Sequence, residues 1–232
     1  MPTIVFASPK GGAGKSTSAL LLATEFAHRG ATVGLIDADP NRPLAKWAAA
    51  GGQHPNLHII ENVTEKTIVD TIDAEAEHVQ FVVVDLEGTA SKMVPFAISR
   101  ADLVIAPTKA SHLDAVESGE AILEVRRAER FVRHPIAAAI LFTQMNPAIR
   151  TRGFASIEGQ FRSHGVPIME CRIMEREAYR AMFAYGRTLR DLDPADARNL
   201  LAAIDNASAF ANEVIAILDR TPAAAGRTAE VA

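Results

Sequence analysis

The sequence predicts a doubly wound α/β fold, in which helices cover both faces of a mostly parallel β-sheet. Short apolar and often β-branched runs, such as Ile4–Ala7 and Phe81–Val84, alternate along the chain with longer segments of helical composition. Within each run the apolar residues are continuous, which is typical of parallel strands buried on both faces. Of the 232 residues, 48% are hydrophobic and 22% charged, so the chain is globular and long enough to build a full core.

The first half of the chain is expected to form four strands and three helices. Each strand is a short apolar run, and each helix is a longer segment with helical composition. The strands are expected at Thr3–Ser8, Thr32–Ile36, Leu57–Ile60 and Phe81–Val84, and the helices at Lys15–Arg29, Leu44–Ala50 and Thr64–His78. Gly30 follows the first helix, where glycine favours the left-handed turn that ends a helix, and Thr64 is a suitable N-cap for the third.

The second half continues the alternation with three strands and four helices. The strands are expected at Leu103–Ala106, Ile136–Thr143 and Val166–Met169, and the helices at Ala115–Arg130, Thr151–His164, Glu175–Tyr185 and Pro194–Leu218. No long linker or internal repeat divides the chain, so residues 1–219 are expected to form one domain. Residues 220–232, rich in alanine with proline and glycine, are expected to form a mobile tail.

Residues 10–17 read Lys-Gly-Gly-Ala-Gly-Lys-Ser-Thr and directly follow the first expected strand. In such a loop the glycines let successive backbone N–H groups point at an anion, the lysine before the serine reaches the β- and γ-phosphates, and the serine hydroxyl ligates Mg²⁺. Pro9 stands where the common pattern has glycine, and Lys10 adds a second cation. The residues expected to bind the nucleotide are Lys10, Gly11, Gly12, Ala13, Gly14, Lys15, Ser16 and Thr17.

This loop with its leading lysine resembles the deviant Walker A motif of the ParA/MinD superfamily, whose ATPases position DNA, proteins or division sites in bacteria. The resemblance implies a P-loop fold, ATP and Mg²⁺ as cofactors, and a two-fold homodimer formed with ATP. Lys15 would contact the phosphates of its own subunit, and Lys10 would reach across the interface to the partner's nucleotide. Hydrolysis of ATP to ADP and phosphate would be weak alone and stimulated by a partner.

Asp37-Ala38-Asp39-Pro40 resembles the second acidic motif of this family. By that resemblance Asp39 positions the attacking water and joins Lys10 and Lys15 as a catalytic residue, while Asp37 helps to organise the metal side. The chemistry requires a carboxylate near Mg²⁺ and near water in line with the γ-phosphate. The alternative is that these aspartates end a strand in a turn or cap the following helix.

Asp85 ends an apolar run, as a Walker B aspartate does, and would hold Mg²⁺ through a water; a capping role is the alternative. The expected metal-binding residues are Ser16, Asp39 and Asp85. Many relatives continue with Asp-x-Pro-Pro or Asp-x-Gly, whereas residues 85–89 of this chain read Asp-Leu-Glu-Gly-Thr. Gly88 would let the backbone approach a γ-phosphate, but a glutamate at position 87 beside phosphate is unexpected.

Two further segments are similar to the VirC-type ATPases, which are ParA-like proteins of T-DNA and conjugative transfer. They are residues 37–47 and residues 176–183, and the second also resembles short plasmid-type ParA proteins. Trp47, in the first segment, is by itself more typical of a packing residue. These matches indicate a subgroup of the family and leave the cargo open.

Charge is unevenly distributed along the chain, whose net charge is −4. Residues 131–190 hold nine arginines against four glutamates, whereas residues 1–130 hold 12 basic and 17 acidic side chains. A basic segment inside an acidic protein is a candidate phosphate-contacting face, and a solvated surface without a partner is the alternative. The residues expected to contact DNA, without sequence preference, are Arg150, Arg152, Arg176, Arg180 and Arg187.

The expected function is that of a ParA-like ATPase that segregates or positions plasmid or chromosomal DNA, with an adaptor of ParB type. Alternatives are the same switch with a protein cargo (a chemoreceptor array, a microcompartment or a DNA-transfer complex) and a metabolic P-loop ATPase or ligase. The single cysteine, Cys171, argues against a cluster-binding reductase. No secretory signal, long apolar run or amphipathic C-terminal tail is visible, so a cytoplasmic, nucleoid-associated protein without a membrane partner is expected.

Overall fold

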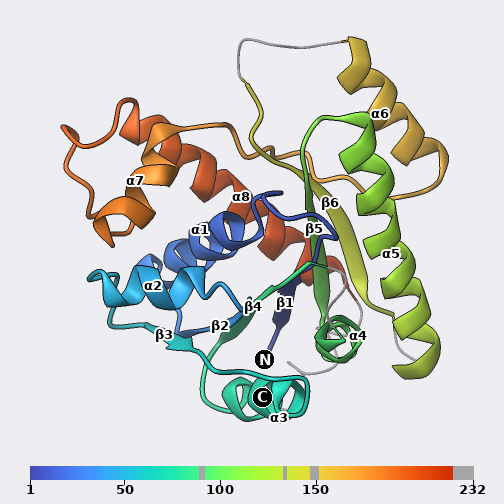
Figure 1. Ribbon diagram of the computed structural model, residues 1–232, viewed down its shortest axis with the longest axis horizontal. Coiled ribbons are helices and arrows are strands. Elements are labelled where there is room, and N and C mark those ends of the chain that lie inside the picture. Colours follow the sequence, from blue (N-terminus) through green and yellow to red (C-terminus); the bar gives the residue numbers. More distant parts are fainter. Residues whose placement is uncertain (89–91, 133–134, 147–151, 222–232) are drawn as a thin grey trace.

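Six parallel strands form one sheet in the order β3-β2-β4-β1-β5-β6, in a computed structural model that describes residues 1–88, 92–132, 135–146 and 152–221 (Figure 1). The strands are β1 (Thr3–Phe6), β2 (Val33–Ala38), β3 (Leu57–Ile60), β4 (Phe81–Leu86), β5 (Leu103–Thr108) and β6 (Ala137–Phe142). Every pairing in this sheet is parallel, and β1 lies between β4 and β5. The predicted doubly wound α/β fold is confirmed.

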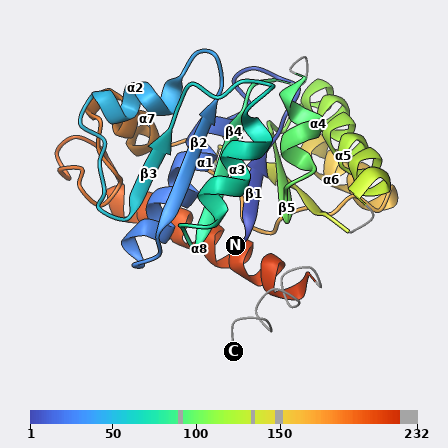
Figure 2. The ribbon, with the colours of Figure 1, turned by 90° about the horizontal axis from the view of Figure 1, so that it is seen from below.

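Helices cover both faces of the sheet, as Figure 2 shows. One face carries α1 (Lys15–His28), α2 (Pro43–Ala49), α7 (Glu177–Tyr185) and α8 (Leu200–Arg220), and the other carries α3 (Ile68–Ala76), α4 (Met93–Ile98), α5 (His112–Val132) and α6 (Arg152–Ser163). Successive residues of β1 point to opposite faces, so Ile4 and Phe6 join the core under α1 and Val5 joins the core under α5. Both faces of the strands are therefore buried, which explains their continuous apolar sequences.

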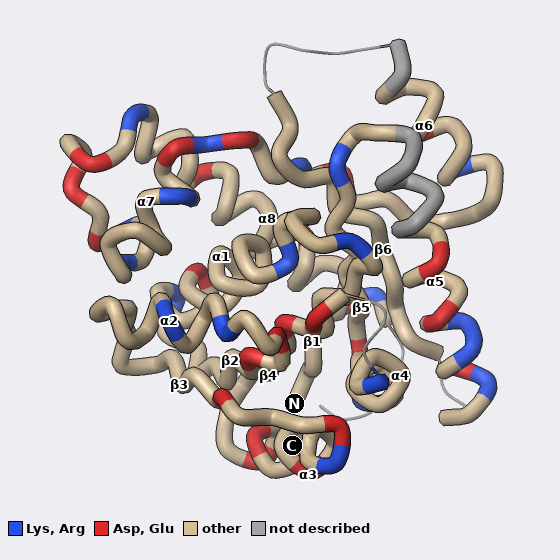
Figure 3. Tube along the Cα trace, viewed as in Figure 1, with Lys and Arg blue, Asp and Glu red and all other residues tan. Residues whose placement is uncertain are grey.

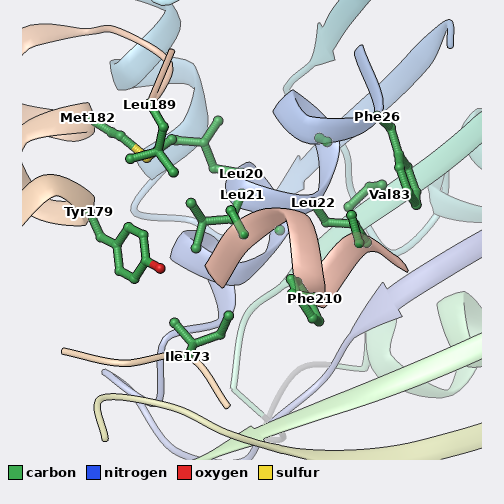
Figure 4. Close-up of a cluster of buried hydrophobic side chains, with 14 of the residues drawn as sticks. Leu20, Leu21, Leu22, Phe26, Val83, Ile173, Tyr179, Met182, Leu189 and Phe210 are labelled. Carbon is green, nitrogen blue, oxygen red and sulfur yellow. The ribbon is translucent and has the colours of Figure 1, made fainter. Parts of the chain in front are cut away.

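The helix α1 lies deep in the core. Its Leu20, Leu21 and Leu22 have no exposed surface and pack among the sheet, α7 and α8 (Figure 4). Burial of one leucine side chain stabilises a fold by roughly 1.5–3 kcal/mol, so these residues anchor the helix firmly. Because α1 begins directly after the glycine-rich loop, the same packing fixes one end of that loop.

The structure corrects several predicted elements. Residues Val166–Met169 form no strand, and only Ile168 makes an isolated bridge, to Ile140 of β6. The helix α3 begins at Ile68, later than predicted. The helix α4 has no counterpart in the prediction, because it has only six residues and contains Pro95, which is unfavourable inside a helix.

The helix α8 begins at Leu200 rather than at Pro194. The segment before it forms a turn, in which the Ala195 N–H donates a hydrogen bond to the Asp193 side chain (2.8 Å). By length and composition α8 could cross a membrane, and one side of it, which includes Ala207, Phe210 and Val214, is buried in the core. Residues 222–232 of the predicted tail lie outside the described residues.

Candidate nucleotide-binding site

The loop between β1 and α1 is held in place by residues at the end of β6. Gly12 and Gly14 adopt left-handed conformations, with φ of 74° and 90°, which glycine accommodates without strain. The Thr143 hydroxyl donates a hydrogen bond to the Ala13 carbonyl (2.7 Å), and the Gln144 side-chain amide donates one to the Gly12 carbonyl (2.8 Å). Two loop carbonyls are thus engaged by β6, so the loop has its shape before an anion binds.

Lys15 begins α1 and is only 6% exposed. Its ammonium donates to the Ser8 carbonyl (3.4 Å) and to the Lys10 carbonyl (3.2 Å). Burial lowers the pKa of Lys15, while nearby carboxylates, Asp85 first among them, raise it in part. The side chain is therefore a partly desolvated cation at the loop, able to exchange carbonyl oxygens for phosphate oxygens.

A cavity of about 500 Å³ opens beside this loop, and we call it the phosphate cavity. It is lined by Pro9, Gly11, Gly12, Gly14, Lys15, Ser16, Thr17, Asp39, Asn41, Glu87, Gly88 and Gln144. Six of the predicted loop residues and Asp39 thus share one cavity. The predicted residues Lys10, Ala13 and Asp85 are not part of its wall, and Ala13 is buried.

Asp85 lies within β4 and has no exposed surface. Among the residues that the structure describes, none makes a hydrogen bond of standard distance and angle to its carboxylate oxygens, although the Ser16 hydroxyl is near enough to interact with them. Burial raises the pKa of Asp85 to about 7, although the nearby Ser16 hydroxyl and Lys15 ammonium lower it in part. A buried carboxylate with unused oxygens beside a hydroxyl is a donor set that suits a hard cation such as Mg²⁺.

Protein side chains alone do not build a complete metal cage here. Within the described ranges, no group of three or more His, Cys, Asp or Glu residues is arranged to hold a metal ion. Mg²⁺ commonly takes one or two carboxylates and completes its shell with water and substrate phosphates. The residues Ser16, Asp39 and Asp85 fit that incomplete set, which phosphate oxygens would complete.

The two aspartates at the end of β2 are used differently. Asp37 is buried, and its Oδ2 accepts the N–H groups of Leu44 and Ala45, each at 2.9 Å, so that it caps the N-terminus of α2. The helix-cap interpretation therefore describes Asp37. Asp39 is half-buried in the wall of the phosphate cavity, and its Oδ1 accepts the Asn41 N–H (2.7 Å), which orients the carboxylate.

A second cavity, of about 350 Å³, adjoins the phosphate cavity and shares Gly14, Thr17 and Gln144 with it. Its remaining walls come from α1, from the residue after β6, from the segment before α7 and from α7 itself. They are formed by Ser18, Thr143, Ile173, Met174, Glu175, Arg176, Tyr179, Arg180 and Phe183. Four of these residues, Ile173, Met174, Tyr179 and Phe183, are apolar or aromatic, and they stand among polar and charged groups beside a phosphate site. Such a wall can receive a nucleotide base, so we call this cavity the base pocket.

Sequence reasoning missed Thr143, Gln144 and Tyr179 as site residues. The first two follow β6 at the same sheet edge as the glycine-rich loop, and that position was the available signal. Gln144 also has a left-handed backbone, with φ of 52°, which is uncommon for a residue other than glycine. Tyr179 enters from α7, and no sequence spacing connects it to the loop.

Comparison with known proteins decides the family. A family model described as VirC1 protein matches residues 1–220. The chain is also 44% identical to the protein ParA of Rhizobium radiobacter over 211 residues, which are 91% of this chain and 95% of that protein. The chain belongs to the VirC1 group of the ParA/MinD-family ATPases.

More distant members of the ParA/MinD family cover most of the chain as well. It is 27% identical to the protein virC1 of Rhizobium rhizogenes, over 78% of this chain and 80% of that protein. It is also 27% identical to the maintenance of carboxysome distribution protein A of Halothiobacillus neapolitanus, over 92% of this chain and 96% of that protein. The family membership implies ATPase activity.

Solved ParA/MinD-family structures share the fold. The Pyrococcus horikoshii MinD complex with Mg-ADP superposes with a TM-score of 0.71 at 16% identity, covering 92% of this chain and 95% of that one. A Borrelia burgdorferi putative plasmid partition protein bound to AMPPNP superposes with a TM-score of 0.65 at 18% identity, covering 90% and 97%. At these identities the likeness shows the fold alone, and it agrees with the parallel sheet of Figure 1.

The arginines expected to contact DNA lie in different surroundings. Arg150 is outside the described residues, and Arg152 begins α6 without a described side chain. Arg176 lines the base pocket, and its Nε is buried. The side chains of Arg180 and Arg187 are 68% and 50% exposed, and they form ion pairs with Glu175 and Asp196 respectively.

The rest of the basic segment is also interspersed with acidic groups. Arg172 pairs with Glu158 (2.8 Å), and Arg190 pairs with the buried Glu25 (3.1 Å). Figure 3 shows basic and acidic residues side by side around α7 and the loop that follows it. In the described residues, acidic partners therefore neutralise part of the positive charge of the basic segment. Of the arginines expected to contact DNA, Arg180 and Arg187 are those whose described side chains are at least half exposed.

Proposed function

We propose that this chain is an ATP-dependent dimerising switch of the ParA type, which binds DNA without sequence preference and hydrolyses ATP to segregate or position plasmid or chromosomal DNA. The observation that carries the proposal is the glycine-rich loop with its leading Lys10, in a chain 44% identical to a protein ParA along nearly all of both sequences. The relatives solved with AMPPNP and with Mg-ADP support ATP and Mg²⁺ as its ligands.

The site residues divide the work of hydrolysis. Lys15 and the backbone N–H groups of the loop bind the phosphates, and Asp39 orients water toward the terminal phosphate. The Ser16 hydroxyl and the Asp85 carboxylate would hold Mg²⁺, whose charge would stabilise the negative charge that develops on the phosphate oxygens. Turnover is weak in the chain alone, because this charge is incompletely neutralised without a further cation.

Dimerisation and partners supply what the single chain lacks. Lys10 of each subunit reaches the partner's nucleotide, so that ATP joins two subunits and doubles the DNA-contacting surface. An adaptor of ParB type, or its cargo-bound equivalent, stimulates hydrolysis and releases the dimer from DNA. The protein would accordingly be cytoplasmic and associated with the nucleoid, without a membrane partner.

A second candidate keeps the switch and changes the cargo. The relative named for carboxysome distribution aligns over 92% of this chain, which supports a protein cargo, and the VirC1 match supports a DNA-transfer complex. The higher identity to ParA, 44% against 27%, favours DNA as the cargo.

Binding to random-sequence duplex DNA tests the proposal. It should be measured with ATP, with ADP and without nucleotide, at two salt concentrations. Binding that appears only with ATP and weakens steeply with salt is the expected result, because phosphate contacts release counterions. If no nucleotide state binds DNA while ATPase activity is intact, DNA binding is wrong and the protein-cargo candidate takes its place.

The role of Lys10 can be tested separately by light scattering. Lys10→Ala should still bind nucleotide but lose the ATP-dependent dimer, whereas Lys15→Ala should lose tight nucleotide binding. Lys66→Ala is a suitable control, because this exposed lysine lies outside the phosphate cavity. A Lys10→Ala protein that still dimerises with ATP would refute the role of this lysine across the interface.

A further inference from the structure

Glu87 is a carboxylate in the wall of the phosphate cavity to which the proposed function assigns no task. It follows β4 two residues after Asp85 and is half-buried. The negative charge of Glu87 acts on the loop, because Glu87 is one of the carboxylates that raise the pKa of Lys15. Within the described part of the chain, Glu87 has no hydrogen bond or ion pair that would neutralise this charge.

The backbone next to Glu87 is pressed against the beginning of the loop. A Cβ atom at Gly88 would lie only 2.9 Å from the Pro9 carbonyl oxygen, so a larger residue does not fit there without a shift. The segment that carries Glu87 therefore stays beside the loop.

The two adjoining cavities suggest how a nucleotide would be oriented, with its base in one and its phosphates in the other. Gly14, Thr17 and Gln144 line both cavities, whereas Glu87 and Asp39 line only the phosphate cavity. A nucleotide with its base in the base pocket and its phosphates along the loop brings its terminal phosphate toward these two carboxylates. ADP is one phosphate shorter, so it would bring less negative charge to this end of the cavity.

The carboxylates at that end of the cavity offset the positive charge that would attract a further anion. Asp39 and Glu87 face Lys15 as the charged residues of the cavity wall, and the buried Asp85 lies nearby. Mg²⁺ held by Asp39 and Asp85 would offset two of these carboxylates, and Glu87 would offset the charge of Lys15, which a γ-phosphate would otherwise meet. A γ-phosphate adds negative charge at this position.

We propose that Glu87 is a specificity-determining residue whose charge weakens the binding of ATP relative to ADP in the single subunit, until a cation from a second copy of the chain neutralises it. The inference rests on the proposed function for nucleotide binding and for dimerisation. Glu87 would thus make tight retention of ATP depend on the partner subunit.

Calorimetric titration of Mg-ADP and of Mg-ATPγS, a slowly hydrolysed analogue, tests the inference in the Lys10→Ala background, which is expected to stay monomeric. Glu87→Gln should raise the ratio of ATPγS affinity to ADP affinity by about three- to tenfold, the size expected for removing one charge several ångströms from a phosphate in a partly exposed site. Glu87→Asp, which keeps the charge, should leave the ratio within about twofold. Glu65→Gln, at an exposed glutamate outside the cavity, is the matched control.

The ratio separates the inference from its alternatives. If Glu87→Gln and Glu65→Gln give the same ratio, or if Glu87→Gln weakens both nucleotides equally, discrimination by Glu87 is overturned. Loss of hydrolysis in Glu87→Gln with an unchanged ratio would also overturn it and would make Glu87 a catalytic residue. If the unmodified chain binds neither nucleotide, the proposed function fails and this inference falls with it.

Discussion

Asp85 is a carboxylate that folding removes from water without a hydrogen bond of standard distance and angle from the described residues. Burial raises its pKa from the ordinary 3.8 to about 7, because the charged form is poorly solvated. The folded protein therefore binds this proton more tightly than the unfolded chain does. As the pH rises from about 4 to about 7, this group lowers the free energy of unfolding of the ligand-free protein.

Replacing the buried charge with an amide should reverse this loss. We expect Asp85→Asn to stabilise the ligand-free protein more at pH 8 than at pH 5, by roughly 1–3 kcal/mol, because the side chain of the unmodified protein is charged only at the higher pH. Urea unfolding at both pH values measures the difference, and Asp85→Asn should also lose Mg²⁺-dependent nucleotide binding. An equal effect at both pH values would show that the buried charge is not the cause.

Much of the site's chemistry can be predicted from the sequence, because it is encoded in adjacent residues. The glycine-rich loop is continuous, and Asp39 and Asp85 are brought to it because parallel strands end at one edge of the sheet. The role of Asp37 cannot be predicted from the sequence, because an aspartate at the end of a strand is equally suited to capping the next helix and to helping to organise a metal site. Its bonds to the N-terminus of α2 show the cap. Tyr179 depends on the docking of α7, which no local pattern encodes.

Among the elements, the junction between α2 and α7 is unusually close. Gly186 ends α7 in a left-handed conformation (φ 58°), and a Cβ at this position would lie 2.4 Å from the Ala50 carbonyl oxygen at the end of α2. The Trp47 indole N–H donates to the Arg187 carbonyl (3.1 Å) across the same junction. These contacts couple the helix that Asp37 caps to the helix that lines the base pocket.

A pair of glycine substitutions tests this junction. Gly186→Ala should lower the free energy of unfolding by roughly 2–4 kcal/mol, because a strained left-handed residue is combined with a backbone clash. Gly30→Ala is the matched control: this glycine follows α1 with φ of 93°, and nothing lies within 4 Å of its Cβ position. It should lose only about 1–2 kcal/mol, the strain alone. Equal losses in urea unfolding would mean that the contact with α2 contributes little.

The sequence predicts well those elements whose hydrophobic pattern extends over one long, continuous segment. Buried strands and α1 lie within a few residues of their predicted bounds. Residues 166–169 are apolar enough for a strand, but they bond to β6 at a single bridge, which only the tertiary structure determines. The short α4 carries too little periodicity to be recognised.

For the whole molecule, the distribution of charge limits how DNA can be bound. The basic segment has acidic partners at many of its described arginines, so a few exposed residues would carry the phosphate contacts. We expect the double variant Arg180→Gln with Arg187→Gln to reduce the slope of log affinity against log salt by about 1–2, since each lost phosphate contact removes nearly one released counterion.

The matched control for this double variant is Arg100→Gln, at an arginine on the opposite face of the sheet that is 42% exposed and paired with Asp73. It should leave the slope of DNA binding with ATP unchanged. If the double variant behaves like the control, Arg180 and Arg187 do not contact DNA.

The outer border of β6 has a consequence for how copies of the molecule can associate. An unpaired strand at a sheet border is a template onto which another chain can add. Here three hydrogen bonds cross that border. The Ile140 N–H donates to the Pro167 carbonyl (2.9 Å), the Met169 N–H to the Ile140 carbonyl (2.9 Å), and the Ile173 N–H to the Phe142 carbonyl (2.8 Å). The chain has covered part of its own template, so addition of another strand to β6 is blocked at these residues. Under the proposed function, copies of the chain would instead associate through the loops at the strand ends, where ATP would bind.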